Sequence, residues 1–258
     1  MCTVVVSVDP HSPVPVVFAG IRDEFFARPW EPPGWHWPDR PELIGGRDLQ
    51  AGGTWLAVNP GHRRVAAILN AFGPPAAEDT RLSRGELPLL AAGGEKITNL
   101  DITRFDPFHL VIATLDTATV STWDGRALTE IALGPGLHMI VNSGVEGHGD
   151  EEFAPPGAME DMSARIVHFR SRLDQAPRPV PIDGDTATAW GAWLPILNGD
   201  GLDPTDHRSL VLRRDFGERG MWGTGSISLL GLRTDGVRYD FSATPGAADG
   251  WQPQTLAA

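Results

Sequence analysis

Short runs of β-branched and apolar residues, separated by turn signals, dominate the chain. The runs at residues 3–8 and 14–20 are rich in valine, and P-H-S-P at residues 10–13 is typical of a turn. These segments therefore predict an antiparallel hairpin at the start of the chain. The same signals predict further strands at residues 52–58, 64–70, 108–115, 119–123, 127–133, 137–142, 209–214, 226–232 and 237–243.

Helices are predicted at three places only. A short one is expected near residues 83–92, and two longer helical stretches cover residues 158–173 and 186–198. Residues 30–41 are rich in proline and tryptophan and predict an irregular loop. Strands joined by short hairpins, with helices grouped apart from them, predict an α+β fold in which helices pack on antiparallel sheets. We find no internal repeat and no domain boundary, so we expect one domain over residues 1–258.

The charge balance argues against a nucleic-acid partner. The chain has a formal net charge of −12, and Lys96 is its only lysine. An acidic surface repels phosphate backbones, although this argument leaves room for one local basic pocket. We find neither a secretory signal nor a run near the ~20 apolar residues of a membrane helix. We therefore expect a cytoplasmic protein that acts on a small-molecule substrate or ligand.

Cys2 is the only cysteine of the chain, and its position carries information. The predicted hairpin places Cys2 opposite Ile21, or one residue away if the register slips. In either register, Arg22 and Asp23 lie within side-chain reach of Cys2. A single cysteine also excludes an internal disulfide, which fits a reducing compartment.

The chemistry of this group fits a nucleophile at the start of the chain. We expect Met1 to be removed, because cysteine is small, and removal leaves a thiol and a free α-amine on Cys2. With a pKa of about 8, this amine can accept the thiol proton, and Arg22 would favour the thiolate. Asp23 would orient the amine or pair with Arg22. A structural interpretation stays open, in which Cys2 is a buried strand residue beside an ion pair.

Several blocks of the sequence resemble the transport and Golgi organisation family, also called the NRDE family after an Asn-Arg-Asp-Glu motif. The resemblance implies an N-terminal nucleophile hydrolase-like fold, a four-layer αββα sandwich of two antiparallel sheets between helices. The blocks are M-C-T at residues 1–3, R-D-E-F-F-A-R-P at 22–29, G-G-T-W-L-A-V-N at 52–59, L-S-R-G-E-L at 82–87, and L-G-P-G-L-H-M-I-V-N at 133–142.

The resemblance also implies roles for individual residues. In related cysteine amidases of that fold, the N-terminal cysteine attacks an amide, and an arginine and an aspartate orient it. These roles fall on Cys2, Arg22 and Asp23. The resemblance assigns the oxyanion donor to Asn142 first and to Asn70 second.

Two departures from the family pattern keep a second hypothesis open. Ile21 stands where the motif begins with asparagine, and Gly225 stands where related amidases have arginine. The first hypothesis is hydrolysis of a non-peptide C–N amide bond by Cys2, without a cofactor. The second is a non-catalytic carrier of haem or of a lipid or acyl-CoA ligand on the same fold. His138 and H-G-D-E-E at residues 148–152 match no metal-ligand spacing, and we interpret that segment as an acidic turn.

Overall fold

A computed structural model describes residues 2–149 and 152–256, which form two antiparallel sheets. The first sheet has eight strands, in the order β11 (Gly144–Val145), β10 (Gly136–Val141), β1 (Thr3–Val8), β2 (Val16–Phe25), β13 (Met221–Arg233), β14 (Gly236–Ser242) and β15 (Trp251–Pro253), with β12 (Arg213–Asp215) also paired to β13. The second has seven, in the order β3 (Trp30–Gly34), β4 (Ile44–Asp48), β5 (Leu56–Asn59), β6 (Arg64–Asn70), β7 (Phe108–Ala113), β8 (Ala118–Trp123) and β9 (Leu128–Ala132). The meander predicted from residues 108–133 is β7–β8–β9.

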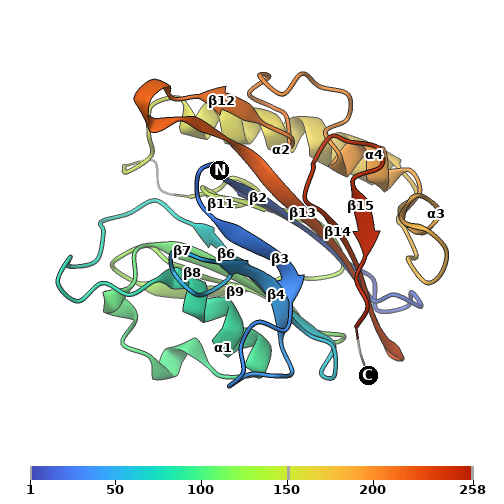
Figure 1. Ribbon diagram of the computed structural model, residues 1–258, viewed down its shortest axis with the longest axis horizontal. Helices are drawn as coiled ribbons and strands as arrows, with labels where there is room; N and C mark the ends of the chain where they lie inside the picture. The colour runs from blue at the N-terminus through green and yellow to red at the C-terminus, as the bar shows by residue number, and fades with distance from the viewer. Residues whose placement is uncertain (1, 150–151, 257–258) are drawn as a thin grey trace.

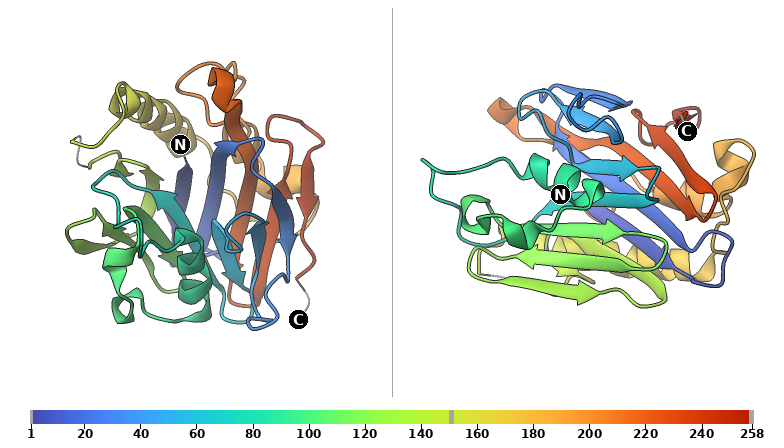
Figure 2. Two further views of the ribbon diagram at one scale, coloured as in Figure 1. Left: turned by 60° about the vertical axis from the view of Figure 1, so that its left-hand side comes forward. Right: turned by 90° about the horizontal axis from the view of Figure 1, so that it is seen from below.

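Helices cover the outer faces of the two sheets, so the molecule has the predicted four layers (Figures 1 and 2). The helices are α1 (Leu87–Gly93), α2 (Ala158–Gln175), α3 (Thr186–Trp190) and α4 (Trp193–Leu197), with 3₁₀ turns η1 (Arg84–Glu86), η2 (Ile97–Asn99), η3 (Ile102–Arg104) and η4 (Gly217–Arg219). The helices α2, α3 and α4 lie on the first sheet, and α1 packs on β5, β6 and β7 of the second. The α+β sandwich expected from the sequence is therefore confirmed.

Strand alternation divides the apolar residues among three cores. On β1, Val4 and Val6 point between the sheets, whereas Val5 points to the helical layer. The helix-side core includes the fully buried Trp190 and Trp193, which is 2% exposed. The third core lies between the second sheet and α1. Residues that are neighbours along one strand thus face different environments. This alternation determines which side chains reach the site described below.

The N-terminal hairpin forms as predicted, with the register shifted by one residue. Thr3 faces Ile21 across β1 and β2, so the next step along the ladder brings Cys2 beside Arg22. The strand β2 continues to Phe25, beyond the predicted end at residue 20, because β13 pairs with its second half. The segment around Arg22 and Asp23 is therefore held by a strand on each side.

Several predictions of secondary structure were wrong in part. The strand predicted at residues 52–58 begins only at Leu56. The loop predicted at residues 30–41 begins with the edge strand β3, where Pro32 and Pro33 are tolerated because an edge needs fewer ladder bonds. The helix predicted at residues 186–198 is two short helices, broken at Gly191, whose φ is +49°.

A further error concerns the strand predicted at residues 209–214, which begins only at residue 213. The Ser209 hydroxyl donates to the carbonyl of Val211 at 2.9 Å and accepts from its N–H at 3.1 Å. These local bonds form a turn and compete with the ladder. The sequence also gave no signal for β4, β11 or β15.

Candidate functional site

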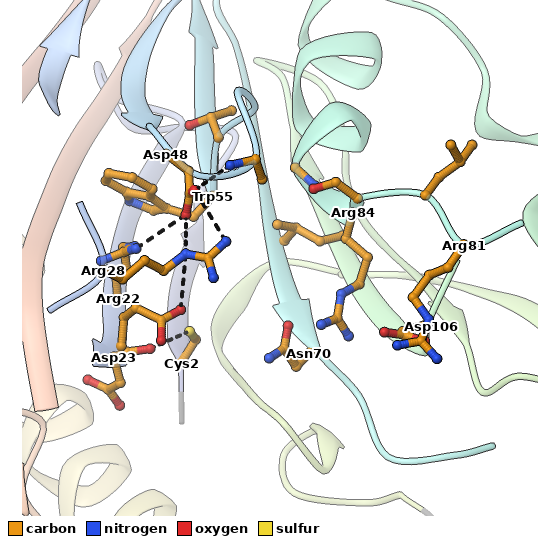
Figure 3. A pocket seen from close by; sticks show the side chains of 17 residues that line it. Cys2, Arg22, Asp23, Arg28, Asp48, Trp55, Asn70, Arg81, Arg84 and Asp106 are labelled. Carbon is orange, nitrogen blue, oxygen red and sulfur yellow. Dashed lines mark hydrogen bonds and ion pairs between the residues drawn. The ribbon is translucent and has the colours of Figure 1, made fainter. Parts of the chain in front are cut away.

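A cavity of about 330 Å³ opens between the two sheets, next to Cys2 (Figure 3). Its walls come from Cys2 just before β1, the second half of β2, residues 48–55, the end of β6, the segment 81–85 and Asp106. We call it the Cys2 cavity. Strands of both sheets therefore contribute to one site, together with the turn that precedes α1.

Cys2 lies on the wall of this cavity, on the face of the first sheet that points between the sheets. Its Sγ is 3.8 Å from the backbone carbonyl of Asp23, the acceptor of its thiol hydrogen bond. Burial raises the pKa of the thiol above its ordinary value, and the charge of Arg22 acts in the opposite direction. At neutral pH the thiol is therefore protonated and needs a base to become a nucleophile.

Asn142, directly after β10, is buried and holds the backbone nitrogen of Cys2. Its Oδ1 accepts from that nitrogen at 2.9 Å, and its Nδ2 donates to the carbonyl of Asn70 at 2.6 Å. One side chain thereby links the first sheet to the second beside the nucleophile. Both ends of the Asn142 amide are engaged in this link.

His109 of β7 supports Asn142 from the second sheet. Its Nε2 lies 3.1 Å from the carbonyl of Asn142, and its Nδ1 lies 2.8 Å from the hydroxyl of Thr122. Burial lowers the pKa of His109 to about 4, so the ring is neutral at pH 7. A carbonyl can only accept, so Nε2 carries the proton and Nδ1 accepts from Thr122.

Asn70, at the end of β6, lines the Cys2 cavity with its side chain. Figure 3 shows it on the strand that faces Cys2 across the cavity. No hydrogen bond joins its carboxamide to another residue of the described chain. Its N–H groups are therefore open to a ligand, whereas Nδ2 of Asn142 already donates to the Asn70 carbonyl.

Arg22 also faces the cavity, but its charge partner is not Asp23. Its guanidinium lies 4.4 Å from the ring centroid of Trp55 and 3.6 Å from Oδ2 of Asp48. Arg28 donates to both oxygens of the same carboxylate, at 2.5 and 3.2 Å. Burial acts to raise the pKa of Asp48, but these contacts outweigh it and lower the pKa overall. Asp48 is therefore the ionised partner that holds Arg22 in place.

Asp23 points to the opposite face of the first sheet, towards the helical layer. Its Oδ1 accepts from the Thr224 hydroxyl at 2.7 Å, and its Oδ2 lies 3.7 Å from Nη1 of Arg165. The side chains of Asp23 and Arg165 are both fully buried. Arg165 also donates to the hydroxyl of Thr3 at 3.0 Å. The pairing of Asp23 with Arg22 considered from the sequence is not formed, because adjacent residues of a strand face opposite ways.

The two departures from the family pattern also have structural explanations. Ile21 is 2% exposed and packs in the helix-side core, so this position does not face the Cys2 cavity. Gly225 lies at a bulge between β13 and β2. A Cβ added there would lie 3.5 Å from Nη1 of Arg22, so a basic side chain at this position would start beside the Arg22 charge.

Residues of the site and its support that were not predicted from the sequence include Arg28, Asp48, Trp55, Arg84, His109 and Arg165. Trp55 and Arg84 belong to the G-G-T-W-L and L-S-R-G-E-L blocks, so a signal for them existed. Asp48 and Arg165 had none, because their place depends on how the sheets and α2 pack.

Neither a metal cluster nor a membrane span is found in the described chain. Among residues 2–149 and 152–256, no three His, Cys, Asp or Glu side chains gather closely enough to hold a metal ion. Of the acidic segment at residues 148–152, Asp150 and Glu151 lie outside the described residues, as does Met1. No described helix has the length and apolar character needed to cross a membrane.

Comparison with known proteins gives a family match and several matches among solved structures. The sequence profile described as Transport and Golgi organisation 2 matches residues 1–175. The structure of penicillin V acylase from Agrobacterium tumefaciens is similar at a TM-score of 0.48 and 12% sequence identity, over 95% of this chain and 84% of that protein. No curated protein matches the sequence.

Proposed function

The chain belongs to the Transport and Golgi organisation 2 family, and from its site we propose that it is a hydrolase of non-peptide C–N amide bonds with Cys2 as nucleophile. The observation that carries the proposal is the position of Cys2. Its thiol lines a cavity of substrate size, while its backbone nitrogen is fixed by Asn142 at 2.9 Å. Removal of Met1 would turn this nitrogen into a free α-amine beside the thiol.

The α-amine is the base of the proposed reaction. Its pKa of about 8 leaves a useful neutral fraction at neutral pH, and it belongs to the same residue as the thiol it deprotonates. Asn142 supports this role because its Oδ1 can only accept, which orients an N–H of the amine and leaves the lone pair free for the thiol proton. The positive charge of Arg22 stabilises the thiolate that forms.

In the first half of the reaction, the thiolate forms a C–S bond to the amide carbonyl carbon. The negative charge develops on the carbonyl oxygen, where the open N–H groups of Asn70 are the donors we assign. This reverses the order expected from the sequence, because Asn142 is not among the residues that line the cavity and its Nδ2 already donates to the Asn70 carbonyl. The C–N bond then breaks as the α-ammonium returns its proton to the leaving amine.

In the second half, water hydrolyses the thioester. The α-amine takes a proton from water, a C–O bond forms, and the C–S bond breaks to release a carboxylic acid. The thiol recovers its proton from the α-ammonium. The amide is thus cleaved to an amine and an acid at the expense of one water molecule, with no redox change and no cofactor.

The experiment that tests this proposal combines intact-mass analysis with amine release from a panel of small amides. We expect the protein purified from cells to lack Met1 and to release amine, and Cys2→Ala to release none above background. A matched control inserts one glycine before Cys2, which keeps the thiol but removes the free α-amine of that residue. Retained Met1, or equal release by the wild type and Cys2→Ala, would exclude this mechanism.

The alternative is a non-catalytic carrier of haem or of a lipid or acyl-CoA ligand, and the lining of the cavity supports it less. Among the described residues that line the cavity, Cys2 is the only one of a type that ligates haem iron. The other walls are mostly charged or polar, whereas the flat face of haem needs apolar surface. A haem titration tests the carrier: a Soret shift that Cys2→Ala abolishes would favour it over the hydrolase.

A further inference from the structure

Arg84 lines the Cys2 cavity but has no role in the proposed reaction. It belongs to η1, where the Ser83 hydroxyl accepts from the N–H of Gly85 at 3.2 Å. The carbonyl of Gly85 accepts from the N–H of Thr54 at 2.9 Å, which fixes this turn against the start of β5.

Two glycines make this contact possible. A Cβ on Gly53 would lie 2.4 Å from the backbone carbon of Gly85, a distance that no side chain tolerates. A Cβ on Gly85 would also be tight, at 3.2 Å from the backbone nitrogen of Thr54. Without side chains the two backbones can meet, and this contact brings Arg84 to the cavity. In Figure 3 its guanidinium points into the cavity, across from Cys2 and next to Asn70.

The other three arginines of the cavity have carboxylate partners. Arg22 and Arg28 share Asp48, and Arg81 lies 3.3 Å from Oδ1 of Asp106. These ion pairs fix the positions of the three guanidinium groups and balance much of their positive charge.

Arg84 is different from these three. One of its nitrogens donates to the carbonyl of Pro107 at 2.8 Å, and no carboxylate of the described chain lies within ion-pair distance. Burial lowers the pKa of Arg84, and the charge of the more distant Asp106 opposes this shift. A guanidinium that is partly removed from water and has no anion beside it is costly. An anion supplied by a ligand would offset this cost, and guanidinium groups bind carboxylate and phosphate oxygens well.

We propose that the substrate carries an anionic group, a carboxylate or a phosphate, which Arg84 binds while the scissile amide lies at Cys2. This inference rests on the proposed function for the identity of the reacting bond, and it adds the class of substrate. The protein as a whole has a net charge of −12. General attraction by the molecule therefore does not draw in an anion, and Arg84 would select it by position.

The test uses Cys2 as its own reporter, because no other cysteine competes for a thiol reagent. The rate of alkylation is measured with iodoacetate, which carries a carboxylate, and with neutral iodoacetamide. Taking the ratio of the two rates cancels any change in the thiolate fraction of Cys2. Arg84→Gln should lower the iodoacetate/iodoacetamide ratio roughly three- to tenfold, as expected for one charge lost at short range.

Two variants control this measurement. Lys96→Gln removes one positive charge from an exposed position outside the cavity and should leave the ratio unchanged. Arg84→Lys keeps the charge and should keep most of the preference for iodoacetate. An unchanged ratio in a folded Arg84→Gln variant, or an equal fall in Lys96→Gln, would overturn the proposal.

A protection experiment separates the two kinds of anion. Acetate and inorganic phosphate are each tested for slowing the alkylation of Cys2 by iodoacetamide. Stronger protection by acetate assigns a carboxylate substrate, and stronger protection by phosphate assigns a phosphate ester. Protection that persists equally in Arg84→Gln would contradict a role for Arg84. None of these measurements needs amide cleavage, so a failure of the proposed hydrolase activity and a failure of this inference are distinguishable.

Discussion

Arg22 and Asp23 are neighbours in the sequence, yet they belong to two different regions of the molecule. Arg22 faces the Cys2 cavity, where its charge lies between Trp55 and Asp48 and can act on the thiol. Asp23 faces the helical layer, where it is sealed against Arg165 with no exposed side-chain surface. The comparison separates two tasks. The cavity face supplies reactive charge, and the buried face anchors the strand that carries it.

The largest expected effect tests the buried face. Arg165→Met should reduce the free energy of unfolding by about 3–5 kcal/mol, because it removes the positive charge from a fully buried ion pair with Asp23. The measurement is equilibrium unfolding in denaturant. Arg214→Met is the matched control, because Arg214 pairs with Asp161 at a partly exposed site, where such pairs contribute about 1 kcal/mol or less. Equal losses in the two variants would show that the buried pair is no anchor.

A smaller effect, a change of stability with pH, is expected from the buried His109, which contacts the Asn142 carbonyl. Its pKa in the folded state is about 4, below the ordinary 6.5, so the unfolded chain binds the proton more readily. Stability from this group is therefore complete above pH 6.5 and falls as pH drops towards 4, by about 2 kcal/mol at pH 4.5.

The variant that isolates this effect is His109→Gln. Its free energy of unfolding should fall less than that of the wild type between pH 7 and 4.5, by about 2 kcal/mol. Arg165 and Asp23 should not contribute to this difference, since neither contacts His109. If both proteins lose the same free energy, the neutral, buried state of His109 is wrong.

The smallest expected effect on stability concerns Arg22. Arg22→Met should cost about 1 kcal/mol, because it removes a cation–π contact and one of the two guanidinium partners of Asp48. Its effect on reactivity is larger, since loss of the positive charge raises the pKa of Cys2 further. The pH–rate profile of iodoacetamide alkylation should therefore move to higher pH in Arg22→Met, and less in Arg22→Lys. An unmoved profile would mean that Arg22 has no influence on the thiol.

The sequence predicted the fold well where β-branched runs and turns coincide. Residues 3–8 match β1 in full. The strand β4 gave no such signal, because its I-G-G-R-D sequence contains two glycines. The structure explains both glycines. A Cβ on Gly45 would lie 2.4 Å from the Leu56 carbonyl, and one on Gly46 would lie 2.3 Å from the Trp55 ring. These glycines let β4 pack closely against residues 55 and 56. Glycine has a low strand propensity, so the sequence of β4 does not predict a strand.

The site was predictable only as far as local pairing reaches. The hairpin brought Arg22 and Asp23 to Cys2 in either register, but it did not assign each to a face. The one-residue shift observed between Thr3 and Ile21 does so. Arg84 and Arg165 reach the site through packing between distant segments. Such contacts depend on sheet stacking and helix placement, which a single sequence does not encode in a readable pattern.

The most direct test of the central claim is to trap the acyl-enzyme. Protein with a verified N-terminus is mixed with an activated anilide and quenched in acid, and its intact mass and N-terminal peptide are then measured. We predict a chain without Met1 that gains one acyl group on Cys2 and releases one equivalent of aniline. Acylation at another residue, or the same mass gain in Cys2→Ala, would contradict the account.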